Sequence, residues 1–318
     1  MAPYGASTKG PEKAVGALVW LHGRSKSDDD TDDWAPYYLR SFRTRGWDVF
    51  RLDRARQFNN NAMSANAAVA KVRDLRNQGY KKVVLAGQSA GGWAVLKAAT
   101  ISGEMDAVIA TAPASHGTRK SDSELFVRAA SDFRKLMEDV AYSKVMIFLF
   151  AEDDYDPGGR GPVARSILSK NGVVHEIIDR PIGFDGHGAA STADFAVEFS
   201  PRMVRFIDSG PTEVLTRDIS IKWPGYLSAF VGKAEAAGER KHQYRVRLAD
   251  QRTYCTVTLS TDDGQQQRWS LACPDNRVAF GVVQADGNGN LFGEGEDLTG
   301  RFVEIRVGRE ATGQQKSS

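Results

Sequence analysis

Residues 83–93, VVLAGQSAGGW, decide the fold of the first two thirds of this 318-residue chain. The apolar run that ends at Gly87 predicts a buried strand, and the residues after Ser89 predict a helix. Gly87, Ser89 and Gly91 spell G-x-S-x-G on the turn between them. The two glycines let strand and helix approach without side-chain collision, so the turn predicts a strained, exposed serine hydroxyl.

Strand-like and helix-like segments alternate up to about residue 208. Apolar, β-branched runs predict strands at residues 16–23, 47–53, 82–87, 106–113, 144–152 and 173–179. Residues 33–46, with Asp32 or Asp33 as N-cap, and residues 64–79 predict helices. This alternation is typical of an α/β fold, a mostly parallel sheet with helices on both faces.

The pattern changes near residue 210, where DSGPT predicts a linker. Alternating segments separated by turn residues then predict an antiparallel β domain, a small barrel or a sandwich, with one short helix within residues 225–238. The rings of this domain fit core packing better than sugar stacking; they are Trp223, Tyr226, Tyr244, Tyr254 and Trp269. We therefore expect a flexible leader (1–13), an α/β domain (14–209), a linker (210–220), a β-rich domain (221–310) and a frayed tail (311–318).

The chain has two cysteines, Cys255 and Cys273, and the midpoint between them falls on Gly264. If a hairpin turns there, the two thiols lie opposite each other and can form a disulfide. A disulfide favours a periplasmic or secreted protein. Two buried free thiols in a cytoplasmic protein are the alternative.

A serine hydroxyl needs a base to become a nucleophile. His187 lies in the glycine-rich loop GFDGHGAAST after the last strand of the α/β part and is the predicted base. The predicted acid is Asp154 at the tip of the strand before it, with Asp153 and Asp156 as alternatives. His116 precedes the acid in the chain and is a weaker candidate base.

The order Ser89, Asp154, His187 is that of nucleophile, acid and histidine in α/β-hydrolases. Over residues 14–208 the sequence resembles the α/β-hydrolase superfamily, and its dienelactone-hydrolase and small-esterase branches more than the lipases. The resemblance rests on the order and spacing of WLHG, GQSAGG, AEDD and GHG.

Two backbone N–H groups are expected to hold the oxyanion. Ala90 follows the nucleophile at a helix N-terminus, and the resemblance implies Arg24, or Gly23, as the second donor, with His22 bracing their loop. The sequence departs from the family pattern in two places. Ala151 stands where a glycine usually precedes the acid, and HGRS replaces the triple glycine of many lipases and esterases.

Composition narrows the possible partners. A net charge of +2 gives no sign of nucleic-acid binding, and no apolar run is long enough for a membrane span. Residues 1–16 lack the segments of a signal peptide. The aspartates of SDDDTDDW (27–34) favour a solvated loop over a Ca²⁺ site because the EF-hand spacing is missing. No phosphate loop or zinc cluster occurs, so we expect no cofactor.

These features predict a serine hydrolase that cleaves a small or protruding carboxylic ester through an acyl-enzyme. A peptidase or amidase with the same three residues is one alternative. The other is a non-catalytic binding protein that acts through its β domain. That domain could mediate oligomerisation or bind an envelope polymer.

Overall fold

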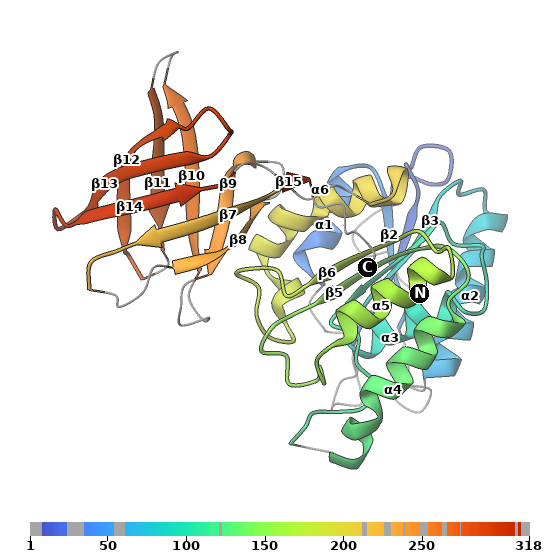
Figure 1. Ribbon diagram of the computed structural model, residues 1–318. Coiled ribbons are helices and arrows are strands. Elements are labelled where there is room, and N and C mark those ends of the chain that lie inside the picture. The colour runs from blue at the N-terminus through green and yellow to red at the C-terminus, as the bar shows by residue number, and fades with distance from the viewer. Residues whose placement is uncertain are drawn as a thin grey trace. The chain divides into compact units, whose positions relative to one another are not determined.

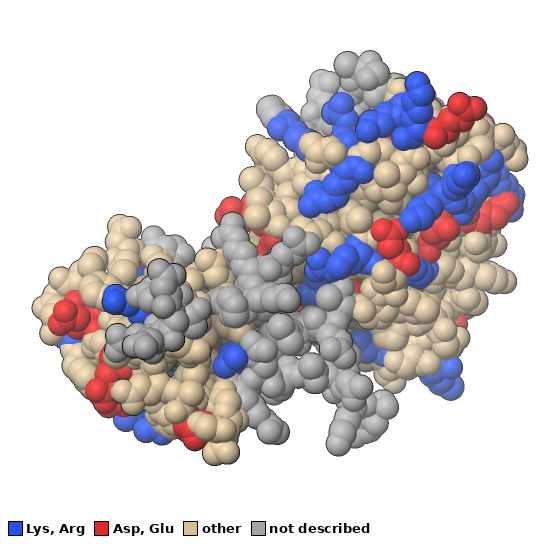
Figure 2. Space-filling view, turned by 90° about the horizontal axis from the view of Figure 1, so that it is seen from above, with Lys and Arg blue, Asp and Glu red and all other residues tan. Residues whose placement is uncertain are grey.

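The computed structural model describes residues 8–23, 35–53, 61–120, 123–211, 215–225, 230–237, 240–247, 254–262, 266–273, 275–308 and 311–312. The chain forms two compact units, Met1–Thr212 and Glu213–Ser318 (Figure 1). Lys and Arg side chains are interspersed with Asp and Glu on the face of the protein seen in Figure 2. Among the described helices none is long and apolar enough to cross a membrane.

The first unit is built on a parallel sheet of six strands in the order β2-β1-β3-β4-β5-β6. Every strand expected in the α/β part is present, which confirms the predicted fold class. The strands are β1 (Ala17–Leu21), β2 (Asp48–Arg51), β3 (Val83–Gln88), β4 (Ala107–Thr111), β5 (Lys144–Leu149) and β6 (His175–Asp179). The strand order reverses between β1 and β3. In open α/β sheets, ligands bind beyond the carboxyl ends of the strands at such a reversal.

Helices cover both faces of this sheet (Figure 1). One core lies beneath α2 (Asn61–Asn77), α3 (Ala90–Ala98), α4 (Ser123–Asp139) and α5 (Arg160–Lys170). The other lies beneath α1 (Tyr37–Thr44), the short 3-10 helix η2 (Ala189–Ser191) and α6 (Ala193–Ser209). Helix α1 follows Pro36, and the predicted caps Asp32 and Asp33 lie outside the described residues.

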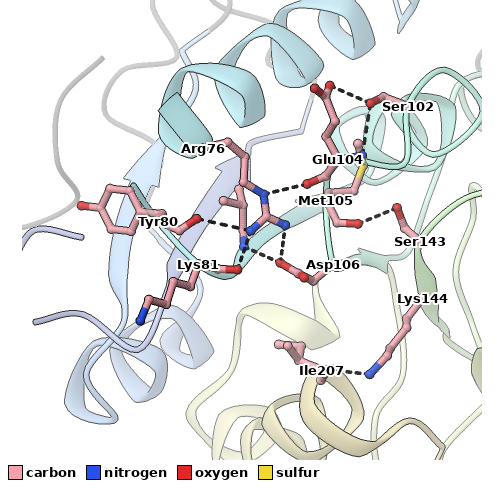
Figure 3. A network of polar contacts seen from close by, with 11 residues as sticks. Arg76, Tyr80, Lys81, Ser102, Glu104, Met105, Asp106, Ser143, Lys144 and Ile207 are labelled. Atoms are coloured by element: carbon pink, nitrogen blue, oxygen red, sulfur yellow. Dashed lines mark hydrogen bonds and ion pairs between the residues drawn. The ribbon is translucent and has the colours of Figure 1, made fainter. Parts of the chain in front are cut away.

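A polar network ties together the amino ends of the central strands (Figure 3). Arg76, at the end of α2, donates to the Asp106 carboxylate at 2.8 Å and to the Glu104 carbonyl at 3.0 Å. The same carboxylate oxygen of Asp106 accepts the backbone N–H of Val83 at 2.6 Å. The Arg76 guanidinium therefore joins α2 to the starts of β3 and β4. These starts lie at the amino ends of the strands, opposite the carboxyl ends where the reversal between β1 and β3 would place a ligand.

Part of the expected leader is ordered. The backbone N–H groups of Lys9 and Gly10 donate to the Asp48 carboxylate at 2.7 and 2.9 Å. The Tyr80 hydroxyl donates to the same carboxylate at 2.7 Å. Because these bonds anchor residues 9 and 10 to β2, the ordered domain begins before residue 14.

The second unit is a closed antiparallel barrel. Its strands are β7 (Leu215–Lys222), β8 (Phe230–Ala237), β9 (Arg240–Arg247), β10 (Tyr254–Asp262), β11 (Gln266–Ala272), β12 (Val278–Ala285), β13 (Leu291–Asp297) and β14 (Phe302–Val307). Each strand pairs with the next, and β14 pairs with β7. A short strand, β15 (Ala311–Thr312), adds to β7. Of the two architectures expected, the structure has the barrel.

The expected helix within residues 225–238 is wrong, because β8 occupies residues 230–237. Strand β7 begins inside the expected linker, and β15 lies in the expected tail. Both differences follow from closure of the barrel, since β7 must pair on both of its edges.

The barrel interior is filled by its own side chains. Trp223, Tyr244 and Trp269 are at most 4% exposed and belong to one apolar cluster. They are core residues, as the sequence favoured, and are not available for stacking on a sugar. The side chains of Tyr226 and Tyr254 lie outside the described residues. Cys255 and Cys273 are joined by a disulfide between β10 and the end of β11.

Asp297 fastens the barrel where β14 meets β7. Its carboxylate accepts the Thr299 hydroxyl at 2.6 Å, the Trp223 indole N–H at 2.9 Å and the Arg301 Nε–H at 2.8 Å. These bonds, led by that from the Thr299 hydroxyl, hold the pKa of Asp297 well below its ordinary value. One buried carboxylate thus links the β13–β14 turn to Trp223 beyond the end of β7.

This arrangement predicts that acid weakens the barrel. The pKa of Asp297 is lower in the folded than in the unfolded chain, so its contribution to stability is present above about pH 4 and is lost as the pH falls further. Asp297→Asn should lower the melting temperature of the barrel at neutral pH, and the difference from wild type should narrow in acid. Melting curves at several pH values measure this. The exposed-site variant Glu296→Gln should follow wild type, and a constant Asp297→Asn difference across pH would contradict the linkage.

Candidate active site

The turn between β3 and α3 places Ser89 in a backbone conformation that side-chain-bearing residues rarely adopt. Its φ is 54° and its ψ is −120°. Such strain costs on the order of 1–3 kcal/mol. Hydrogen bonds on both sides hold the turn, because the Ser89 N–H donates to the Thr111 carbonyl and its carbonyl accepts from Ala114, each at 3.0 Å. The strained serine is therefore fixed against the end of β4.

The two glycines of the motif are required by close backbone approach. A Cβ on Gly91 would lie 2.0 Å from the Leu21 carbonyl oxygen, and one on Gly87 would lie 2.4 Å from the Gly91 carbonyl oxygen. The start of α3 therefore passes directly against the end of β1. The predicted strand-turn-helix geometry is present.

The loop after β1 lies beside Ser89. A Cβ on Gly23 would come within 3.3 Å of Ser89 Cβ and 3.8 Å of its Oγ. His22 is buried, and its Nδ1 donates to the carbonyl of the neighbouring Gly23 at 2.7 Å, which restrains that peptide group. Ala90, the first residue of α3, is nearly buried beside the nucleophile. Arg24, the other expected oxyanion donor, lies outside the described residues.

His187 is paired with Asp153. Its Nδ1 donates to the two carboxylate oxygens of Asp153 at 2.9 and 3.1 Å, and the Asp153 side chain is only 1% exposed. The chain segments that carry them are joined two residues earlier, where Ala151 and Asp185 form a parallel β-bridge. This bridge brings the two segments together, and beyond it the Asp153 carboxylate meets the His187 ring.

The expected pairing of Asp154 with His187 is therefore corrected to Asp153. Asp154 is exposed, and its carbonyl accepts from the Arg119 N–H. Asp156 is used elsewhere, because its carboxylate accepts from Arg160 Nε at 2.8 Å and from the Gly158 N–H at 2.8 Å. Successive residues point in different directions at the strand tip, and no sequence signal fixes which of the three carboxylates meets the histidine.

Gln88 links the serine and histidine loops and was not singled out from the sequence. Its side-chain Nε2–H donates to the His187 carbonyl at 3.2 Å. Since Gln88 immediately precedes Ser89, this bond ties the His187 backbone to the end of β3. Ser89, His187 and Asp153 are thus held at one edge of the sheet by β3, β5 and β6.

The remaining described histidine rings are engaged elsewhere. His116 Nε2 bonds to the Asp132 carboxylate at 2.9 Å, and its ring contacts that of Trp93. His175 Nδ1 donates to the Val173 carbonyl at 2.8 Å. Across the described ranges, His, Cys, Asp and Glu side chains do not gather in groups of three that could hold a metal ion. The aspartate run at 28–33 lies outside them.

The sequence matches no protein-family model and no curated protein. Solved structures do match its first unit. Dipeptidyl peptidase 4 of Porphyromonas gingivalis is 14% identical with a TM-score of 0.50, over 63% of this chain and 32% of that chain. A puromycin-hydrolysing peptidase of Mycobacterium tuberculosis is 16% identical with a TM-score of 0.49, over 65% and 36%. Esterase B of Lactobacillus rhamnosis is 14% identical with a TM-score of 0.47, over 65% and 78%.

The match to dipeptidyl peptidase 4, together with the strand order, gives the class of fold. The first unit has the α/β-hydrolase fold, with an antiparallel barrel after it in the chain. This chain spans about a third of the length of the two peptidases. At these identities the likeness concerns the fold, and the chemistry must be argued from the site itself.

The Asp153–His187 pair can be tested directly by proton NMR. A proton shared between imidazole Nδ1 and a carboxylate resonates far downfield, and His187→Gln would identify the signal by removing it. We expect the signal to vanish in Asp153→Asn and to persist in the neighbouring control Asp154→Asn. The reverse pattern would show that Asp154 is the partner.

Proposed function

We propose that this protein is a serine hydrolase that cleaves a carboxylic ester through a covalent acyl-enzyme. The observation that carries the proposal is the strained Ser89 at the switch point, on the same sheet edge as the Asp153–His187 pair. A positive φ on a serine is costly and persists where the surrounding structure imposes it. Strain of this kind concentrates at active sites.

The proposed chemistry uses five groups of the chain. His187 Nδ1 is occupied by Asp153, so Nε2 is the nitrogen that takes the Ser89 proton as Oγ attacks the carbonyl carbon. Asp153 fixes this tautomer and stabilises the imidazolium that forms. The backbone N–H of Ala90 points with the N-terminus of α3 at the developing oxyanion. Gly23, beside Ser89 Oγ, or Arg24 after it supplies the second N–H.

The acyl-enzyme then breaks down along the same route. The protonated His187 gives its proton to the leaving oxygen, and the carbonyl re-forms as that bond breaks. A water molecule next loses a proton to His187 and attacks the acyl carbon. As the bond from that carbon to Ser89 Oγ breaks, His187 returns the proton to Oγ, which releases the acid and restores both residues. No step requires a metal or an organic cofactor.

A small or protruding ester is the proposed substrate. Between β4 and β5 the described chain forms the single helix α4, which leaves little material for a large cap over the site. An open site suits a scissile bond that projects from its carrier. An amide would use the same residues, with the leaving nitrogen protonated by His187, and remains the second candidate.

Labelling with a fluorophosphonate tests the proposal. The probe reacts with an activated serine, so intact mass should show one adduct on wild type and none on Ser89→Ala. The same pair should differ by at least about 10⁴-fold in hydrolysis of p-nitrophenyl acetate. Asp153→Asn should approach the serine variant, whereas Asp154→Asn should stay near wild type.

The outcomes separate the candidate functions. Adduct formation with turnover of p-nitroanilides but not of p-nitrophenyl esters would favour the amidase. A folded wild type that forms no adduct and hydrolyses neither class would contradict the hydrolase. It would direct attention to binding by the barrel.

We further propose that the protein works in the periplasm or outside the cell. The support is the Cys255–Cys273 disulfide, because such bonds persist in oxidising compartments and are rare in the cytosol. In that setting the barrel could serve oligomerisation or bind an envelope polymer. Such a partner would have to meet side chains other than the buried Trp223, Tyr244 and Trp269.

A further inference from the structure

The ring of Tyr155 lies on the face of the His187 imidazole. The two ring centroids are 4.1 Å apart and the planes are inclined by 31°. Among the described ring pairs of the first unit this is the shortest separation; the next shortest is 4.9 Å, between Phe195 and Phe199 in the core. A stack this close, outside the apolar core and on the candidate base, needs an explanation.

The backbone delivers Tyr155 to this position. Asp153 Oδ1 accepts the Tyr155 N–H at 2.9 Å, and the same oxygen accepts His187 Nδ1 at 2.9 Å. The carboxylate therefore holds the edge of the imidazole and the backbone that carries the tyrosine ring. Glu152, which immediately precedes Asp153, has a φ of 57°, so the chain bends sharply at this turn.

The space beside the His187 backbone is open. A Cβ on Gly186 or on Gly188 would meet nothing within 4 Å, and the bond from Gln88 holds the His187 backbone rather than its ring. The His187 side chain is 23% exposed. Hydrogen bonds to Asp153 fix the ring edge in its plane but leave the ring able to tilt about that edge. A flat group on its face removes this freedom.

We propose that Tyr155 is a positioning residue for His187, which keeps Nε2 directed at Ser89 and shields one face of the imidazole from water. The aromatic face also attracts the imidazolium that forms when His187 accepts the Ser89 proton. The inference rests on the proposed hydrolase function, because it assigns the tyrosine a role only through the base. The ring face, rather than the hydroxyl, is the part that acts.

Two substitutions separate the ring from the hydroxyl. Tyr155→Phe keeps the stack, so kcat for p-nitrophenyl acetate should stay within about twofold of wild type. Tyr155→Leu keeps apolar bulk but loses the flat face. It should lower kcat about tenfold, equivalent to about 1.4 kcal/mol, with KM unchanged. Tyr142→Leu, at a half-exposed tyrosine outside the site, is the matched control and should have wild-type kinetics.

Proton NMR provides a reading that does not depend on turnover. The tyrosine ring current should shift the His187 ring protons upfield in wild type and in Tyr155→Phe, and the shift should be absent in Tyr155→Leu. His187→Gln identifies the signals. Should the leucine variant fail to fold, Tyr155→Asn replaces it, because asparagine suits a turn.

Several results would overturn the inference. A Tyr155→Leu enzyme with wild-type kcat despite the lost ring shift would show that the stack does not act on catalysis. A raised KM with unchanged kcat would make Tyr155 a substrate contact, and equal damage in Tyr155→Phe would assign the effect to the hydroxyl. If wild type itself fails to label at Ser89, the hydrolase proposal falls and the catalytic role of Tyr155 falls with it. The ring shift alone would then describe a structural contact.

Discussion

The first unit depends on one backbone constraint, the close crossing of α3 over the end of β1. Gly91 passes so near the Leu21 carbonyl that no side chain fits, and Ser89 takes up the strain of the turn with a φ of 54°. The same crossing sets Gly23 against Ser89 Oγ. A cost of about 1–3 kcal/mol for one strained residue is a sizeable part of a domain's net stability, and the surrounding packing must offset it.

The amino and carboxyl ends of the strands in the parallel sheet are held in different ways. At the amino ends, Arg76 and Asp106 join α2, β3 and β4 through charge-assisted hydrogen bonds (Figure 3). Among the described residues, positive φ angles bend the chain at the carboxyl ends, at Ser89, Ala112, Glu152 and Arg180, and also at the amino end of β5, at Ser143. Such bends aim side chains that a regular strand or helix would direct elsewhere.

The sequence was sufficient to predict the six strands, the Ser89 turn and the pairing of His187 with an aspartate that follows β5, because each has a local signal in periodicity or glycine content. The aspartate that pairs with His187 could not be predicted from a local signal. Asp153 and Asp154 have identical side chains, and contacts between segments far apart in the chain, such as the Ala151–Asp185 bridge and the bond of Asp153 to His187, distinguish them. The helix predicted within residues 225–238, where β8 lies, was wrong for another reason. Its sequence FVGKAEAA contains good helix formers, but pairing with β7 and β9 overrides that local preference.

Closure of the barrel decides which of its side chains are accessible to a ligand or partner. Pairing of β14 with β7 turns one face of every strand inward, and the rings that a flat sheet could have offered to a ligand become the core. The outward positions then carry the accessible apolar surface. Phe280, Phe292 and Phe302 are each about half exposed on neighbouring strands β12, β13 and β14. Glu296 pairs with both Phe280 and Phe302, so a carboxylate lies between two exposed rings. Phe292 instead pairs with Arg306, whose guanidinium lies 5.2 Å from the centre of its ring, so the outward side chains of the barrel combine aromatic rings with charges of both signs.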